Sequence, residues 1–174
     1  MKCVFSIMDN DRGKKIYNEM MKWLRPNYEV MECWHDGSQF EFPGINMAMN
    51  YSLQSNEPVL YIHSKGAGNH NGCQPIIRKW WKKELTTNKD KYIEAIKQHD
   101  VVTMITGDEK HTWFNSFMAT PKAFKTIESM LKEPNPNRYF YEDMWLNTDV
   151  DVYGVLSNDI NHYNVQEIGK YIKV

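Results

Sequence analysis

The segment that decides the fold lies at residues 59–68 and reads VLYIHSKGAG. Its first four residues are apolar and follow Pro58, a pattern typical of a strand buried on both faces of a parallel sheet. Polar and cationic residues then replace the apolar ones, and Gly66 lets the backbone turn sharply. Because ligands of open α/β sheets bind where strands end, this segment predicts a ligand-binding edge. A strand followed by a plain surface loop is the alternative.

The side chains that follow the apolar run define the expected site. His63, Ser64 and Lys65 stand at the end of the predicted strand, where a ligand would lie. The ammonium of Lys65 favours an anionic ligand.

The chain before this segment contains the same unit twice. Residues 3–8 form a short apolar run that ends at Asp9-Asn10-Asp11, and a helical pattern follows from Arg12 to the break at Pro26. Residues 28–34 then form a second strand-like run that ends in a turn-forming segment, HDGS. Strands that each end in polar residues, with a helix between them, indicate an α/β fold with a polar edge.

The remaining chain continues this alternation. We expect helices at residues 43–53, 74–85, 92–98 and 121–131, strands at 101–106 and 149–153, a mixed strand-like stretch at 113–119, and a last short helix in the tail from 157 to 174. In the helix from Pro121, the predicted buried stripe is Phe124, Ile127, Met130 and Leu131.

Composition narrows the class of protein. A chain of 174 residues with 41% hydrophobic residues can build one sizeable core, so a single domain over residues 1–174 is expected. The formal net charge of -1 gives no overall bias toward nucleic acid. The three cysteines are dispersed without a CxxC pair, which favours a reducing compartment. With no signal peptide or membrane span evident, a cytoplasmic location is expected.

The helix at residues 74–85 has a basic face. Arg78, Lys79, Lys82 and Lys83 lie mostly opposite an apolar stripe that contains two tryptophans. Such a face can bind phosphate or nucleic acid, or it can simply be solvated. Arg78 is nearest to the loop after residue 65 and is the best candidate for phosphate contact.

Two acidic stretches could carry chemistry. Glu142 and Asp143 are adjacent carboxylates among large apolar residues, so one of them could act as a general base, or both could be acids favoured at a helix N-terminus. Asp149 and Asp151 alternate along an expected strand, which suits either a metal pair or a solvated edge strand. The lone His162 in the tail is expected to be structural.

Over residues 2–147, the order of these motifs resembles a compact nucleotide-sugar glycosyltransferase of the GT-A fold. In that family the first strand ends in an asparagine-bearing loop and the second in Asp-Asp-Gly-Ser, where this chain has residues 6–10 and 35–38. A glycine-led helix with Ala-x-Asn follows, matched here by residues 44–50. The resemblance implies a three-layer α/β/α sandwich with a mostly parallel, Rossmann-like central sheet.

The next motifs resemble a divergent branch of that family. The family's Asp-x-Asp is replaced by residues 63–66, HSKG, which resemble the His-Ser/Thr-Lys-Gly motif of polysaccharide-assembly transferases. Residues 113–118 resemble that branch's acceptor-side Asn-Phe-Trp-Trp region, and residues 142–146, EDMWL, resemble the Glu-Asp-x-x-Leu motif that supplies the base.

The resemblance implies an inverting, hexosyltransferase-like enzyme that moves a sugar from a nucleotide-sugar donor to the hydroxyl of a glycan or other acceptor. Asp143 is expected to be the base, with Glu142 as the alternate, and Asp36 to read the nucleotide base or ribose. Lys65, with Arg78, is expected to stabilise the leaving diphosphate. The residues expected to contact the donor are Ser6, Asn10, Asp36, His63, Ser64, Lys65, Gly66 and Arg78.

The absence of Asp-x-Asp affects whether the chain is expected to bind a metal. In the family this motif holds a divalent cation against the donor pyrophosphate, and a histidine with a lysine cannot form a carboxylate cage for Mg²⁺ or Mn²⁺. Activity without a metal or other cofactor is therefore expected. The alternative is a cation recruited by Asp149, Asp151 or His162.

Two other classes of function stay open. One is a catalytically inactive nucleotide- or sugar-binding module of the same fold. The other is a nucleic-acid-binding protein that uses the helix from Arg78 to Lys83, which the neutral net charge disfavours. Because few residues follow the base motif, a homodimer or a partner protein is expected to complete the acceptor site.

Overall fold

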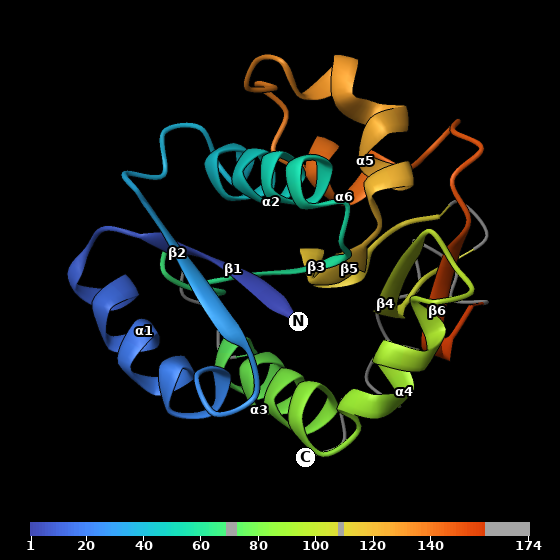
Figure 1. Ribbon diagram of the computed structural model, residues 1–174. Helices are drawn as coiled ribbons and strands as arrows, with labels where there is room; N and C mark the ends of the chain where they lie inside the picture. The colour runs from blue at the N-terminus through green and yellow to red at the C-terminus, as the bar shows by residue number, and fades with distance from the viewer. Residues whose placement is uncertain (69–72, 108–109, 159–174) are drawn as a thin grey trace.

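The structure is a computed structural model that describes residues 1–68, 73–107 and 110–158. Six strands in this part form one central sheet with the order β2-β1-β3-β5-β4-β6 (Figure 1). Of these strands, β5 runs antiparallel to both of its neighbours, and the other pairings are parallel. The expected α/β fold with a mostly parallel sheet is confirmed. The strands are β1 (Lys2–Met8), β2 (Glu29–His35), β3 (Val59–His63), β4 (Val101–Ile105), β5 (Phe117–Ala119) and β6 (Val152–Ser157).

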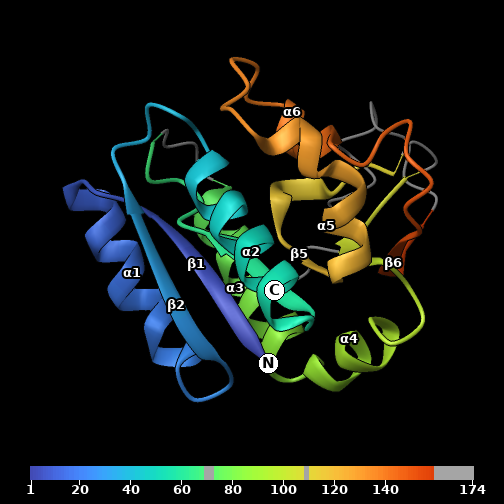
Figure 2. The same cartoon turned by 45° about the horizontal axis from the view of Figure 1, so that its top comes forward.

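Helices cover both faces of the sheet. They are α1 (Asp11–Leu24), α2 (Phe42–Ser55), α3 (Gln74–Thr86), α4 (Lys89–Ala95), α5 (Pro121–Ile127) and α6 (Phe140–Asp143), with 3-10 turns η1 (Trp113–Asn115) and η2 (Glu128–Leu131). Helices α1, α3 and α4 lie on one face, and α2, α5 and α6 lie on the other (Figures 1 and 2). Each face has its own hydrophobic cluster, centred on Trp80 and Trp81 of α3 on the first and on Phe124 and Trp145 on the second.

The strand at the centre of the sheet is β3, the apolar run from which the fold was predicted. Residues 59–62 are all buried, as expected for a strand between two neighbours and two helical layers. In register, Ser6 of β1 pairs with His63 of β3, and Met8 of β1 pairs with His35 of β2. The ends of three parallel strands therefore meet at one edge of the sheet.

In the second half of the chain, the bounds of several helices and strands differ from those predicted from the sequence. Helix α4 begins three residues earlier than expected, at Lys89, and its buried Tyr92 packs into the core and donates a hydrogen bond to Glu84. Phe114 and Asn115 have left-handed backbone angles, so residues 113–115 form a turn and the strand is confined to β5. Met130, expected in the buried stripe, is 42% exposed because the helix tightens into η2.

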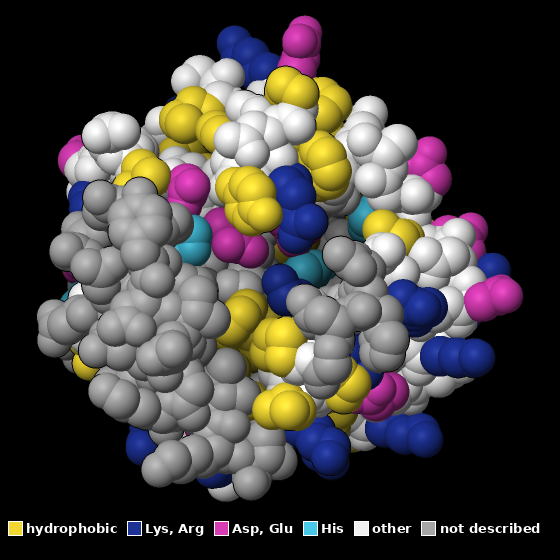
Figure 3. Space-filling view, turned by 180° about the vertical axis from the view of Figure 1, so that it is seen from behind, with side chains coloured by type: hydrophobic (Ala, Val, Ile, Leu, Met, Phe, Trp, Pro, Cys, Tyr) yellow, Lys and Arg dark blue, Asp and Glu magenta, His cyan; other side chains and the backbone are white. Residues whose placement is uncertain are grey.

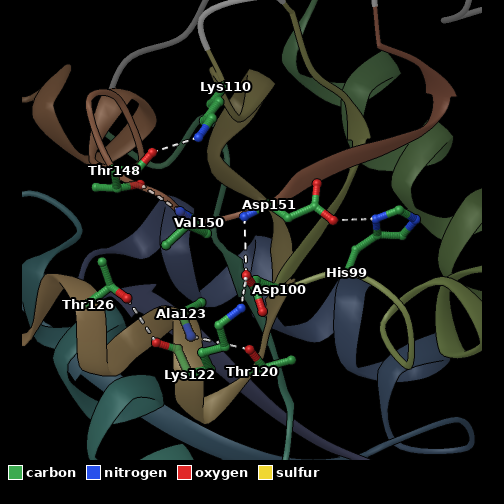
Figure 4. A network of polar contacts seen from close by, with 10 residues as sticks. All are labelled: His99, Asp100, Lys110, Thr120, Lys122, Ala123, Thr126, Thr148, Val150 and Asp151. Carbon is green, nitrogen blue, oxygen red and sulfur yellow. Dashed lines mark hydrogen bonds and ion pairs between the residues drawn. The ribbon is translucent and has the colours of Figure 1, made fainter.

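The expected edge strand is present as β6, but it begins after both of its predicted aspartates. The Oδ2 atom of Asp151 lies 2.8 Å from Nδ1 of His99, and the Asp151 N–H donates to Asp100 (Figure 4). Asp100 also accepts a hydrogen bond from Lys122 of α5. These carboxylates therefore join the starts of β4, β6 and α5. The expected tail helix and His162 lie outside the described residues. Among the described residues, no helix is long and apolar enough to cross a membrane.

Candidate functional site

A cavity of about 250 Å³ lies where β1, β2 and β3 end. Its walls come from five segments: the ends of the three strands, the chain that enters α2, and the segment around α6. Histidine, acidic and basic side chains gather near the middle of the face shown in Figure 3. The residues that line the cavity are Ser6, Met8, His35, Gly37, Phe40, Glu41, His63, Ser64, Ala67, Gly68, Arg138 and Glu142. The sheet edge predicted from residues 59–68 is therefore a concave site.

Two predicted serines hold the strand ends together. The Ser64 hydroxyl accepts a hydrogen bond from the Met8 N–H at 3.0 Å. The Ser6 hydroxyl lies 3.0 Å from Nε2 of His35, whose Nδ1 accepts the Gly37 N–H at 3.2 Å. Since Nδ1 accepts, the neutral His35 ring donates from Nε2 to Ser6. Burial lowers the pKa of His35, which keeps this ring neutral.

Lys65 brings positive charge to this cavity. Its ammonium lies 5.4 Å from the centre of the Phe114 ring, a cation–π contact, and it forms no ion pair within the described ranges. Burial and the Lys65 charge together lower the pKa of His63 to about 3. The same charge acts on Glu41 and Glu142, so the ammonium lies within electrostatic reach of three cavity side chains.

Arg78 has a different position from the one predicted. Its guanidinium is nearly buried, pairs with the Glu19 carboxylate at 3.1 Å and donates to the Lys65 carbonyl at 2.8 Å. It lines a separate cavity with Gly66, on the α1 side of the loop. Gly66 has a φ of 96°, so the loop turns there through a conformation that glycine adopts readily. Arg78 therefore supports the backbone of Lys65 from behind, outside the main cavity.

Asn10 and Asp36 also lie outside the lining. The Asn10 side chain caps α1 by accepting the Gly13 N–H at 2.7 Å and donates to the Ala67 carbonyl at 3.2 Å, so it anchors the loop after β3. Asp36 is exposed, and hydrogen bonds from Ser38 lower its pKa. Because its neighbours His35 and Gly37 line the cavity, Asp36 stands at the rim.

The two carboxylates of α6 point to different places. Glu142 lines the cavity, whereas Asp143 hydrogen-bonds Nδ1 of His111. Burial alone would raise the pKa of Glu142, but the His111 hydrogen bond and the Lys65 charge outweigh it and lower this pKa. Glu142 is therefore ionised at neutral pH and faces the cavity. Of the two acids, Glu142 is therefore the one that reaches the cavity, and Asp143 lies behind it against His111.

The sequence did not single out Glu41, Arg138 or His111 as site residues. Glu41 accepts a hydrogen bond from the Asn115 amide at 2.6 Å, and its Oε1 lies 3.4 Å from Nδ1 of His63. Arg138 lines the cavity and its guanidinium stacks on Tyr139. Arg138 stands just before the acidic motif, so a search for cations near that motif would have found it. No pattern around Glu41 or His111 marks them.

Of the expected alternative metal ligands, Asp149 and Asp151 do not line this cavity, and His162 lies outside the described residues. Asp151 is engaged by His99 at the far edge of the sheet, and Asp149 lies in the same segment. Within the described ranges, no group of three or more His, Cys, Asp or Glu side chains could hold a metal ion.

Comparison with known proteins gives no family. No protein-family model matches the chain, and no curated protein matches it. The resemblance of the motifs to glycosyltransferases therefore supports a proposal and does not show a family.

Proposed function

We propose that this chain is a glycosyltransferase of the GT-A type that moves a sugar from a nucleotide-sugar donor to an acceptor hydroxyl without a bound metal. One observation carries the proposal. Arg138 and the ionised Glu142 line one cavity where three parallel strands end, and the Lys65 ammonium lies within electrostatic reach of Glu142; neither cation has an ion-pair partner in the described ranges. This is the edge at which open α/β sheets bind nucleotides.

The charges suit a displacement at the anomeric carbon of a donor sugar. Glu142 takes the proton of the acceptor hydroxyl while the oxygen of that hydroxyl forms a bond to the anomeric carbon. The bond from that carbon to the diphosphate oxygen breaks, and the diphosphate leaves with the electron pair. Lys65 and Arg138 stabilise the negative charge that develops on it, and the configuration inverts because attack and departure are on opposite faces.

The supporting residues prepare this chemistry. The His111 ring, held by Asp143, orients the Glu142 carboxylate. Arg78 fixes the Lys65 backbone from behind. The cavity is near the small end of the range for ligand pockets, which suits the diphosphate and sugar, with the nucleoside extending over the rim past Asp36 and Phe40. Phe40 is 38% exposed there and offers a flat apolar surface.

A nucleotide- or sugar-binding module without turnover is the second candidate. It is favoured by the HSKG segment, which stands where the family has its metal-binding carboxylates. Binding without donor hydrolysis or transfer across a panel of acceptors would select it. The nucleic-acid alternative is weakened because Arg78 faces Glu19 and leaves only lysines on the exposed part of that helix face.

Thermal unfolding in the presence of UDP or GDP, with EDTA, tests the proposal. Binding to the folded state raises the melting temperature, and about 100-fold excess over Kd is worth ~2.7 kcal/mol. Lys65→Ala and Arg138→Ala should each abolish or sharply reduce the shift. Lys79→Ala, which removes an exposed cation of α3, is the matched control and should keep it. Absence of a shift with both nucleotides would refute the proposal.

A further inference from the structure

We infer that Glu41 serves the proposed nucleotide site as a protonated carboxyl, which shares its proton with His63 and is held in the protonated form when an anionic ligand fills the cavity. This inference rests on the proposed function, because it states how the same site accepts a diphosphate beside two acidic side chains. Glu41 and Glu142 both line the cavity, but their hydrogen-bond partners differ.

The contacts of the two His63 ring nitrogens favour a proton between His63 and Glu41. Nε2 of His63 lies 3.0 Å from the Phe114 carbonyl oxygen, which can only accept, so Nε2 carries a proton. In the neutral ring Nδ1 then presents a lone pair, and the Oε1 atom of Glu41 lies 3.4 Å from it. Two lone pairs in that position repel each other, whereas one proton held between the two atoms makes the contact favourable.

The surroundings assign that proton to Glu41. Burial and the positive charge of Lys65 oppose a second proton on His63, whose pKa falls to about 3. Burial raises the pKa of Glu41 to about 7, and the Glu142 charge acts in the same direction. The titratable and charged groups that act on Glu41 come from β3 and the loop after it, from α6 and from the segment before α6: His63, Lys65, Tyr61, Tyr141, Glu142 and Arg138.

Neutral Glu41 changes the charge of the cavity. If both acids were ionised, they would balance Lys65 and Arg138 and leave the site with no net attraction for an anion. With Glu41 protonated, the balance is one positive charge. A diphosphate placed near Glu41 also disfavours ionisation of this carboxyl, so binding and protonation of Glu41 reinforce each other.

The experiment measures proton uptake when UDP binds in EDTA. Titration calorimetry in two buffers of different ionisation enthalpy, at about pH 8 and about pH 6, gives the number of protons bound per UDP. Relative to Glu41→Gln, wild-type protein should take up close to one additional proton at the higher pH and close to none at the lower, so that proton exchange by UDP itself cancels in the comparison. Glu41→Gln, which imitates the neutral carboxyl, should show only the uptake due to UDP itself and should bind at least as tightly at about pH 8. Glu94→Gln, on the exposed end of α4, should behave as wild type.

The outcomes separate the two proposals. UDP binding with no more uptake in wild type than in Glu41→Gln at about pH 8 overturns the role of Glu41 and leaves the nucleotide site standing. Failure of UDP and GDP to bind at all overturns both. If Glu41→Gln does not fold, the wild-type series still decides. With a pKa of about 7, Glu41 is mostly ionised in the free protein at about pH 8, and UDP is fully ionised there, so uptake close to zero would show that Glu41 does not become protonated when UDP binds.

Discussion

The Oε2 atom of Glu142 lies 3.5 Å from Nε2 of His111, a ring whose other nitrogen is hydrogen-bonded by the next residue, Asp143. Burial opposes a charge on His111, but the two carboxylates outweigh it and raise the pKa of the ring. The charged form of this ring is thus favoured beside Glu142, whose own pKa is lowered. Adjacent acids in one helical turn point in different directions, and here one faces the cavity while the other contacts the histidine.

The first prediction separates these two acids. Glu142→Gln should lower the rate of sugar transfer by about 10²–10⁴-fold, the usual contribution of a general base, while leaving the UDP- or GDP-induced rise in melting temperature in place. Asp143→Asn should keep more of the activity, because it loosens His111 without removing the base. Steady-state kinetics with a nucleotide-sugar donor measures both. The reverse ranking of the two variants would restore Asp143 as the base.

The second prediction separates two arginines. Arg138 is exposed at the cavity, so Arg138→Ala should weaken nucleotide binding and leave the free energy of unfolding within about 0.5 kcal/mol of wild type. Arg78 is nearly buried and pairs with the half-exposed Glu19, so Arg78→Ala should cost about 1–3 kcal/mol, mainly by leaving the Lys65 carbonyl without its donor. Urea unfolding and nucleotide titration of both variants check this. A stable Arg78→Ala protein with lost binding would contradict the assignment.

The strands around the site could be predicted from the sequence because uninterrupted apolar runs indicate buried strands. Residues 3–8 and 59–62 could only be core, and the polar residues after them had to meet at one edge of a parallel sheet. Ser6, His63 and Ser64 therefore lie together in the cavity lining, and Lys65, outside the lining, acts on it through its charge. Their contact with a donor stays a prediction.

The misplaced residues depend on contacts between distant segments. Arg78 was expected at the ligand from its position near the loop, but the partner that turns it away, Glu19, lies on α1. Glu41 becomes part of the site through Asn115, 74 residues away, which is brought there by the left-handed turn of η1. Periodicity and local propensity carry no information about such pairings. Burial of a carboxyl is likewise a property of the folded surroundings, so its pKa could not be expected from sequence.

The third prediction concerns the packing beneath the cavity. A Cβ atom on Gly44 would lie 2.5 Å from Oγ of Ser6 and 2.9 Å from the Tyr61 ring, both on central strands. Gly44→Ala should therefore push α2 away from the sheet and lower the free energy of unfolding by about 1–3 kcal/mol. Because Glu41 directly precedes α2, nucleotide binding should weaken as well. Ala48→Gly, on the same buried face of α2, is a control that removes a methyl group without a clash. If Gly44→Ala were as stable as wild type, α2 would be packed less closely against the sheet than these distances indicate.

The last prediction concerns the pH dependence of stability. The pKa of Glu41 rises from its ordinary value of 4.5 to about 7 in the folded protein, so between these values the folded state binds more protons than the unfolded state. The free energy of unfolding contributed by this group is therefore greatest below 4.5, falls as the pH rises, and is fully lost above about 7. A glutamine, which does not ionise, avoids this loss.

Glu41→Gln should accordingly gain stability relative to wild type as the pH increases. At about 1.4 kcal/mol per pKa unit, and reduced because the side chain is partly open to solvent, the gain from about pH 4 to about pH 8 is on the order of 2 kcal/mol. Urea unfolding of both proteins at the two pH values measures it, with Glu94→Gln as the exposed control. A difference between Glu41→Gln and wild type that does not change with pH would mean that Glu41 ionises in the folded protein as it does in an unfolded chain.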